Sequence, residues 1–123
     1  MRNIVIFGDT KFSERLYEYI SLEQIDKVIA FTQESKYINR KDIKRIPVIP
    51  FEDLSQLLPN TEFEIILGIG YSGMNTLREN IYNICKLKKY KIGTYISSKA
   101  IVYTSLIGDG NFICPGTILG PNV

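Results

Sequence analysis

Short apolar runs alternate with segments of helical spacing over the first hundred positions of the chain. The run 3–7 is almost continuously apolar and ends at Gly8, which is typical of a strand buried on both faces. The segment 11–20 carries apolar residues at intervals of four, which predicts an amphipathic helix. A second apolar run follows at 27–31. Strand, helix and strand in this order predict a right-handed βαβ unit and a parallel sheet.

The same alternation continues to position 96. A polar, charged stretch covers 34–45, and the run 46–50 then predicts a strand bracketed by prolines, which suits a sheet edge or a strand end. We expect four further elements: a short helix over 51–58, a buried strand over 63–67, a long helix over 74–89 and a last strand over 91–96. The long helix places four residues on one apolar face: Leu77, Ile81, Ile84 and Cys85. The pattern predicts a doubly wound, Rossmann-like α/β domain over residues 1–98.

Beyond Ala100 the interval between apolar residues changes to six. A branched aliphatic residue opens each of four consecutive hexapeptides: Ile101, Ile107, Ile113 and Leu119. With small second positions and Gly, Pro and Asn between, this indicates the truncated start of a left-handed parallel β-helix over 99–123, although two ordinary hairpins remain the alternative. Three hexapeptides make one coil, so this chain holds little more than one coil and cannot bury the inner face of the β-helix alone. We therefore expect the apolar residues Ile113, Ile118 and Leu119 to dock on the α/β domain or to stay partly exposed.

With both halves in view, the chain resembles the hexapeptide-repeat bacterial sugar O- and N-acyltransferases, which include sialic-acid O-acetyltransferases and bacillosamine N-acetyltransferases. The resemblance covers the whole chain and is strongest over 69–78, over 95–100 and in the hexapeptides. It implies an enzyme of surface-polysaccharide or glycan biosynthesis, with a nucleotide-linked sugar on the N-terminal domain. It also implies acetyl-CoA between the β-helices of a homotrimer and a β-helix histidine as general base.

The sequence departs from this family because it contains no histidine and only four hexapeptides. In the family the catalytic histidine lies in later coils. We therefore expect a truncated chain that carries the substrate-binding part, has no catalytic residue of its own and is inactive alone. We expect acetyl-CoA to bind the full-length family enzyme and not this chain by itself. The short β-helix leaves the family's homotrimer doubtful for this chain.

Candidate binding residues follow the predicted strands, because ligands of open α/β sheets bind outside the carboxyl ends. After the first strand, Gly8, Asp9, Thr10 and Lys11 combine a helix N-terminus with a lysine that could face a diphosphate. A carboxylate repels phosphate, so Asp9 would either bind a sugar or ribose hydroxyl or belong to an ordinary helix cap.

Two further strand ends offer polar groups. Thr32 and Gln33 would suit hydrogen bonds to a base or ribose, or would form an ordinary polar loop. The third end has the most candidates: Gly68, Gly70 and Tyr71, followed on the next helix by Asn75 and Arg78. Glycines allow close approach of the backbone, and a tyrosine offers a ring face and a hydroxyl. The arginine could neutralise a phosphate or pair with Glu79 on the surface.

Two other functions fit parts of the pattern. The first is an NAD(P)-type dinucleotide-binding module, although Thr10 and Ser13 stand where its fingerprint has a second and a third glycine. The second is a non-catalytic interaction module that offers the open end of the β-helix to a partner chain.

The amino-acid composition reduces the number of functions that fit the chain. A net charge of +2 gives no general nucleic-acid or membrane surface, and the absence of a long apolar run predicts a cytoplasmic protein. With no histidine and two cysteines far apart, no metal site is expected. We expect both Cys85 and Cys114 to be buried structural thiols.

Overall fold

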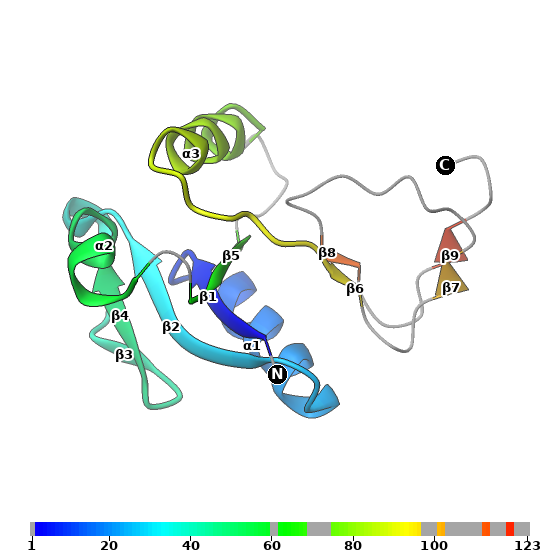
Figure 1. Cartoon of the computed structure of the whole chain (residues 1–123). Helices are drawn as coiled ribbons and strands as arrows, with labels where there is room; N and C mark the ends of the chain where they lie inside the picture. Colours follow the sequence, from blue (N-terminus) through cyan, green and yellow to red (C-terminus); the bar gives the residue numbers. More distant parts are fainter. Residues whose placement is uncertain are drawn as a thin grey trace.

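A computed structural model gives the three-dimensional structure of the chain (Figure 1). It describes residues 2–59, 62–68, 75–96, 101–102, 112–113 and 118–119. Side chains are described for 2–59, 62–68 and 79–96.

The central sheet of the described residues has the strand order β3-β4-β2-β1-β5. Its strands are β1 (Asn3–Phe7), β2 (Lys27–Gln33), β3 (Asp42–Ile43), β4 (Ile46–Pro50) and β5 (Glu64–Leu67). Strands β4, β2, β1 and β5 run parallel, and β3 pairs antiparallel with β4. The chain builds outward from β1 to β4 and then returns to the other side of β1 to form β5. This reversal confirms the predicted parallel α/β architecture and puts the topological switch point between β1 and β5.

Helices cover both faces of the sheet. They are α1 (Lys11–Glu23), α2 (Leu54–Leu57) and α3 (Asn75–Leu87), with single 3-10 turns at η1 (Ser35–Tyr37) and η2 (Phe51–Asp53). The alternation of side chains along β1 explains the two layers. Ile4 and Ile6 pack in one core cluster with the buried side of α1. Val5 and Phe7 pack in the other, with residues of α2 and α3.

Helix α3 differs from its prediction on one flank. Ile81 and Cys85 are buried, as the apolar face requires. Ile84, predicted on the same apolar face, is 37% exposed. Ile81 and Cys85, four residues apart, face the sheet, and Ile84 lies at the side of this contact. The side chain of Leu77 lies outside the described set.

The polar stretch 34–45, for which no element was predicted, contains η1 and β3. Strand β3 forms a two-residue hairpin with β4, because Ile43 pairs with Ile46. The two loop residues, Lys44 and Arg45, both have positive φ angles, 52° and 68°. Such loops favour Asn and Gly, so this turn holds two ordinary L-residues in an unfavourable backbone region. Lys44 Nζ lies 3.7 Å from Glu14 Oε1 and 3.8 Å from Glu18 Oε1 of α1, so two exposed ion pairs join the hairpin to the helix.

The predicted strand 91–96 is divided between two sheets. Its first half extends the central sheet, because Ile65 N–H donates to Lys91 O and Gly93 N–H donates to Ile65 O, both at 2.8 Å. Its second half, β6 (Tyr95–Ile96), pairs instead with β8 (Phe112–Ile113). Strands β7 (Ile101–Val102) and β9 (Ile118–Leu119) form another parallel pair. In Figure 1 both pairs lie beyond β5, away from β3 and β4.

Both C-terminal pairings join residues that are 17 positions apart, Tyr95 to Phe112 and Ile101 to Ile118. The hexapeptide register would instead place Ile101 beside Leu119. The observed separation of paired residues is therefore one residue shorter than three hexapeptides. The expected docking or exposure of Ile113, Ile118 and Leu119 concerns side chains outside the described set. Among the helices described, none combines the length and the apolar character needed to cross a membrane.

Candidate ligand site at the carboxyl edge of the sheet

The backbone at the switch point is closely packed. Gly8, directly after β1, donates its N–H to Thr32 O, and Gly68, directly after β5, donates its N–H to Phe7 O, both at 2.8 Å. Gly8 has a φ of 121°, and a Cβ there would lie 2.5 Å from Ser13 Oγ and 2.7 Å from Gly68 O. Only glycine fits this conformation and this space. Packing between the strands and the start of α1 thus accounts for the glycine at position 8.

Ser13 of α1 contacts the same place, where β1 and β5 end. Its side chain is fully buried, and its hydroxyl donates to Gly68 O at 3.0 Å. A Cβ at Gly68 would lie 2.9 Å from this hydroxyl oxygen. Protein atoms therefore fill the space in which a side chain at Gly8 or Gly68 would lie. This close packing fixes the ends of β1 and β5 relative to each other.

Asp9 is buried and organises a neighbouring loop. Its Oδ2 accepts a hydrogen bond from Asn39 N–H at 2.8 Å. The N-cap residue of α1 is Thr10, which makes no side-chain capping bond. The structure thus gives the N-cap position to Thr10 and not to Asp9, whose carboxylate contacts the loop that leads into β3.

The exposed groups at this edge are suited to an anion. Thr10 and Lys11 are both exposed at the start of α1, where unpaired N–H groups and the helix dipole favour negative charge. Within the part of the chain that is described, Lys11 has no ion pair. Nearby, Arg40 Nη1 is 3.2 Å from Glu14 Oε2 and so is partly neutralised. Among the described side chains at this edge, Lys11 is thus an exposed cation without an ion pair.

The two candidate residues at the end of β2, Thr32 and Gln33, differ in their contacts. Thr32 is fully buried, and its Oγ1 donates to Ile49 O at 2.8 Å, so this hydroxyl ties β2 to β4. Gln33 is half-buried and uses its Oε1 to accept from Glu34 N–H at 2.9 Å. The amide nitrogen of Gln33 is the group that remains for a base or a ribose.

Two segments that the sequence did not single out, directly after β2 and β4, are joined by hydrogen bonds. Glu52 accepts from Ser35 N–H through both carboxylate oxygens, at 3.1 and 3.2 Å, and hydrogen bonds from Ser35 lower the pKa of Glu52. Asn39 is held by Asp9. These residues were missed because their position depends on contacts between distant segments, for which a polar stretch has no local signal.

The remaining candidates lie at the end of β5. Gly70 and Tyr71 fall outside the described residues. Asn75 and Arg78 lie in the first turn of α3, and their side chains also fall outside the described set. The helix begins after the carboxyl end of β5, so its start lies at the same edge of the sheet as Gly8.

A groove of about 480 Å³ lies at the opposite edge, where β2 and β4 begin. Its lining residues are Tyr17, Ser21, Gln24, Asp26, Lys27, Val28 and Ile46. It contains none of the predicted binding residues. The predicted binding residues that are described lie instead at the carboxyl edge of the sheet.

Neither a reactive thiol nor a metal centre is found among the described side chains. Cys85 is fully buried, which confirms that it is a structural thiol, and burial raises its pKa to about 11. Within the described residues, no three His, Cys, Asp or Glu side chains are grouped to hold a metal ion. Cys114 lies outside them.

Comparison with known proteins finds similarity in fold alone. No family model matches the chain, and no curated protein matches it. A variant of perosamine N-acetyltransferase from Caulobacter crescentus, in complex with CoA and GDP-perosamine, superposes with a TM-score of 0.80 at 18% identity. The superposition covers 99% of this chain and 56% of that one.

A second solved structure has the same fold. The acetyltransferase domain of PglB from Neisseria gonorrhoeae, in complex with acetyl coenzyme A, superposes with a TM-score of 0.74 at 19% identity. That superposition covers 95% of this chain and 55% of the PglB domain. The chain thus spans little more than half the length of either structure and shares its fold.

Proposed function

We propose that this chain is the nucleotide-sugar-binding portion of an acetyl-CoA-dependent sugar N- or O-acetyltransferase of surface-polysaccharide or glycan biosynthesis. The observation that supports it best is the extent of the fold similarity. It covers 99% of the chain, and the similar structure was solved with CoA and GDP-perosamine. Neither the sheet nor the C-terminal strand pairs alone would favour this function over other α/β proteins.

The proposal includes the division of the chain. Residues 1–98 form the Rossmann-like substrate domain, and 99–123 begin a left-handed β-helix. Two separate parallel pairings at the same separation of 17 residues support a helical coil, because ordinary hairpins pair antiparallel. The first pairing already involves Tyr95, so β6 links the two parts.

The carboxyl edge offers the groups that a nucleotide diphosphate requires. Lys11 and the first turn of α1 would meet the phosphates, and Gln33 would hydrogen-bond the base or ribose. The remaining contacts would come from the segment after β5, from Gly70, Tyr71, Asn75 and Arg78, while Gly68 would hold the end of β5 through its bonds to Phe7 O and Ser13. Asp9 and Thr32 would support this edge through the backbone contacts they already make.

The chain has no histidine, so we propose that it binds the acceptor and leaves acetyl transfer to parts that it does not contain. Acetyl-CoA would supply the thioester that the sugar amine or hydroxyl attacks once its proton is removed. A homotrimeric, cytoplasmic enzyme belongs to the same proposal.

A binding panel tests the proposal. UDP-, dTDP- and GDP-sugars, NAD and acetyl-CoA are added to the chain in a thermal-shift assay, and every response is quantified by titration calorimetry. A ligand that binds only the folded chain raises its melting temperature. We expect a response to one class of nucleotide sugar and none to NAD or to acetyl-CoA. Silence from all nucleotide sugars, or a response to NAD alone, would contradict the proposal.

Two lysine variants locate the ligand. We expect Lys11→Ala to weaken nucleotide-sugar binding about tenfold, or ~1.4 kcal/mol, because one phosphate contact is lost. The matched control is Lys27→Ala, which removes an exposed lysine at the opposite edge of the sheet and should leave the affinity unchanged. Equal effects of the two variants would argue against a site at the carboxyl edge.

A further inference from the structure

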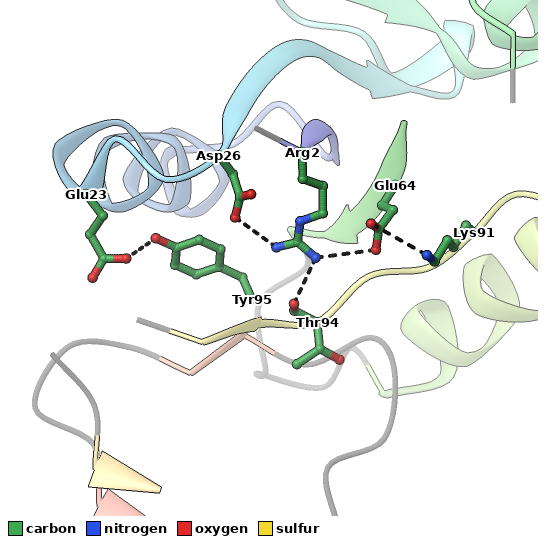
Figure 2. A network of polar contacts seen from close by, with 7 residues as sticks. All are labelled: Arg2, Glu23, Asp26, Glu64, Lys91, Thr94 and Tyr95. Atoms are coloured by element: carbon green, nitrogen blue, oxygen red, sulfur yellow. Dashed lines mark hydrogen bonds and ion pairs between the residues drawn. The ribbon is translucent and has the colours of Figure 1, made fainter. Parts of the chain in front are cut away.

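We propose that Arg2 is a positioning residue that fixes the C-terminal strand pairs in one orientation relative to the central sheet. Figure 2 shows its side chain at the centre of a polar network at the amino edge of the sheet, far along the strands from the candidate ligand site. The functional part of this inference rests on the proposed function, whereas the orientation itself can be measured without a ligand.

One guanidinium joins three separate segments. Arg2 Nη2 donates to Asp26 Oδ2 at 3.0 Å, in the turn before β2. Its Nη1 donates to Glu64 Oε1 at 3.3 Å, at the start of β5, and to Thr94 O at 3.2 Å, directly before β6. A planar fork of donors can satisfy acceptors in different directions at once, which the ammonium group of a lysine does less well.

The charges of the network make Arg2 its central cation. The side chains of Asp26 and Glu64 are only 10% and 18% exposed, so both carboxylates need a partner. Lys91 Nζ also lies 3.8 Å from Glu64 Oε2, but its side chain is 74% exposed. Such an exposed pair contributes little, so Arg2 provides most of the compensation.

The route of the chain explains why side chains decide the orientation here. Among the described residues of this segment, the last backbone bond to the central sheet is Gly93 N–H to Ile65 O. The next two residues are fixed through side chains, Thr94 by Arg2 and Tyr95 by its hydroxyl, which donates to Glu23 Oε2. Tyr95 is buried in the core cluster beside α1 and at the same time forms β6 with Phe112 as its partner. The direction in which β6 leaves the sheet is therefore set by these two contacts.

This joint matters for the proposed enzyme because the acceptor is assigned to the sheet and the acetyl donor to another part of the assembly. The distance between the two reactants depends on the angle at which the C-terminal part leaves the sheet. A misplacement of about 1 Å can cost on the order of a hundredfold in rate, so a rigid joint is a catalytic requirement even far from the reacting atoms.

Residual dipolar couplings of the complete chain in solution test the inference. In the wild type we expect one alignment tensor to fit the backbone N–H vectors of the central sheet and of β6, β7, β8 and β9 together. In Arg2→Met we expect the two groups to need different tensors, with smaller couplings in the C-terminal pairs. The control is Arg45→Met, which removes an exposed arginine that has no ion pair among the described residues and should keep one tensor. A single tensor in Arg2→Met would overturn the inference.

Two further variants keep the test decisive if Arg2→Met fails to fold. Arg2→Lys retains the charge but loses the fork, so it should fold and still need two tensors. Tyr95→Phe removes the bond to Glu23 and should also reduce the couplings of the C-terminal pairs. If Arg2→Lys keeps one tensor, Arg2 does not set the orientation, whatever Tyr95→Phe shows.

Binding separates this inference from the proposed function. We expect Arg2→Met to bind the nucleotide sugar within about twofold of the wild type, because the ligand site lies at the other edge of the sheet. Absence of nucleotide-sugar binding in the wild type would contradict the proposed function and leave the orientation result standing.

Discussion

At the scale of single residues, the buried polar groups near the candidate site bond to the backbone. Ser13 donates to Gly68 O, Thr32 donates to Ile49 O, and Asp9 accepts from Asn39 N–H. Each bond joins segments that are distant in the sequence, so these side chains fix the shape of the edge at which the ligand is proposed to bind. Polar residues directly after a strand indicate this edge from the sequence. They do not indicate which of these side chains bond within the protein and which can still bind a ligand.

Tyr90 is the exception among the buried polar side chains that the structure describes. Its ring packs between Phe51 and Phe63, with centroids 5.8 Å from each, and its hydroxyl has no hydrogen-bond partner among the described residues. Burying an unpaired hydroxyl is unfavourable, so Tyr90→Phe should leave the free energy of unfolding unchanged or raise it by up to ~1 kcal/mol. Urea denaturation measures this. Tyr95→Phe is the matched control and should lower stability, because Tyr95 donates to Glu23. Clear destabilisation by Tyr90→Phe would contradict the absence of a partner.

The backbone strain of Arg45 gives a second prediction. A non-glycine residue in the left-handed region costs about 1–2 kcal/mol, so Arg45→Gly should raise the free energy of unfolding by roughly 1 kcal/mol. Arg45→Ala removes the same charge but keeps the Cβ, and should have little effect. Thermal unfolding of the two variants separates strain from charge. Equal shifts in both would show that the positive φ angle is not the cause.

Cys85 gives a prediction about pH. Burial raises the pKa of its thiol from 9.0 to about 11, so the folded chain holds this proton to a higher pH than the unfolded chain. The contribution to stability is therefore complete below about pH 9 and is lost as the pH rises towards 11. Between pH 8 and 10.5 the wild type should lose about 2 kcal/mol more than Cys85→Ala does. Urea unfolding of both proteins at the two pH values measures the difference, and parallel losses would contradict the burial of the thiol.

At the scale of elements, the contact between α1, β1 and β5 is the one on which the candidate site depends. A Cβ on Gly8 would meet Ser13 Oγ at 2.5 Å and Gly68 O at 2.7 Å, and the φ of 121° disfavours any side chain. We expect Gly8→Ala to lower the free energy of unfolding by at least about 2 kcal/mol. Thr10→Ala, two residues away, removes no capping bond and should cost less than about 0.5 kcal/mol. Chemical denaturation compares the two, and equal costs would contradict the packing.

Elements with a clear local pattern were predictable from the sequence. The apolar runs gave β1, β2, β4 and β5, and the spacing by four gave α1 and α3, because burial on a sheet imposes these periods directly. The hairpin β3–β4 was not predictable, since its loop holds Lys44 and Arg45 where Asn and Gly would signal a turn. The division of 91–96 between two sheets was also missed, because strand partners are chosen by distant residues. For the same reason Thr32 was correctly placed at the edge but not recognised as a tie between strands.

At the scale of the whole molecule, the chain joins an α/β sheet to a pair of two-stranded parallel ladders that lie beyond it (Figure 1). We assign different roles to the carboxyl edge and the amino edge of the sheet. The carboxyl edge is proposed to bind the nucleotide sugar, and the amino edge carries the Arg2 network that holds the start of the C-terminal part (Figure 2). Both ladders join residues that are 17 positions apart, one fewer than the interval of three hexapeptides.

The central claim is that a nucleotide-linked sugar binds at the carboxyl edge of the sheet, and the most direct test is an NMR titration of the ¹⁵N-labelled chain with UDP-, dTDP- and GDP-sugars. We predict that one of them shifts the amide signals of Gly8, Thr10, Lys11 and Gln33 in a saturable manner. The signals of Gln24 and Lys27, at the opposite edge, should stay in place. No saturable shift with any of the three classes, or shifts confined to the groove around Lys27, would contradict the account.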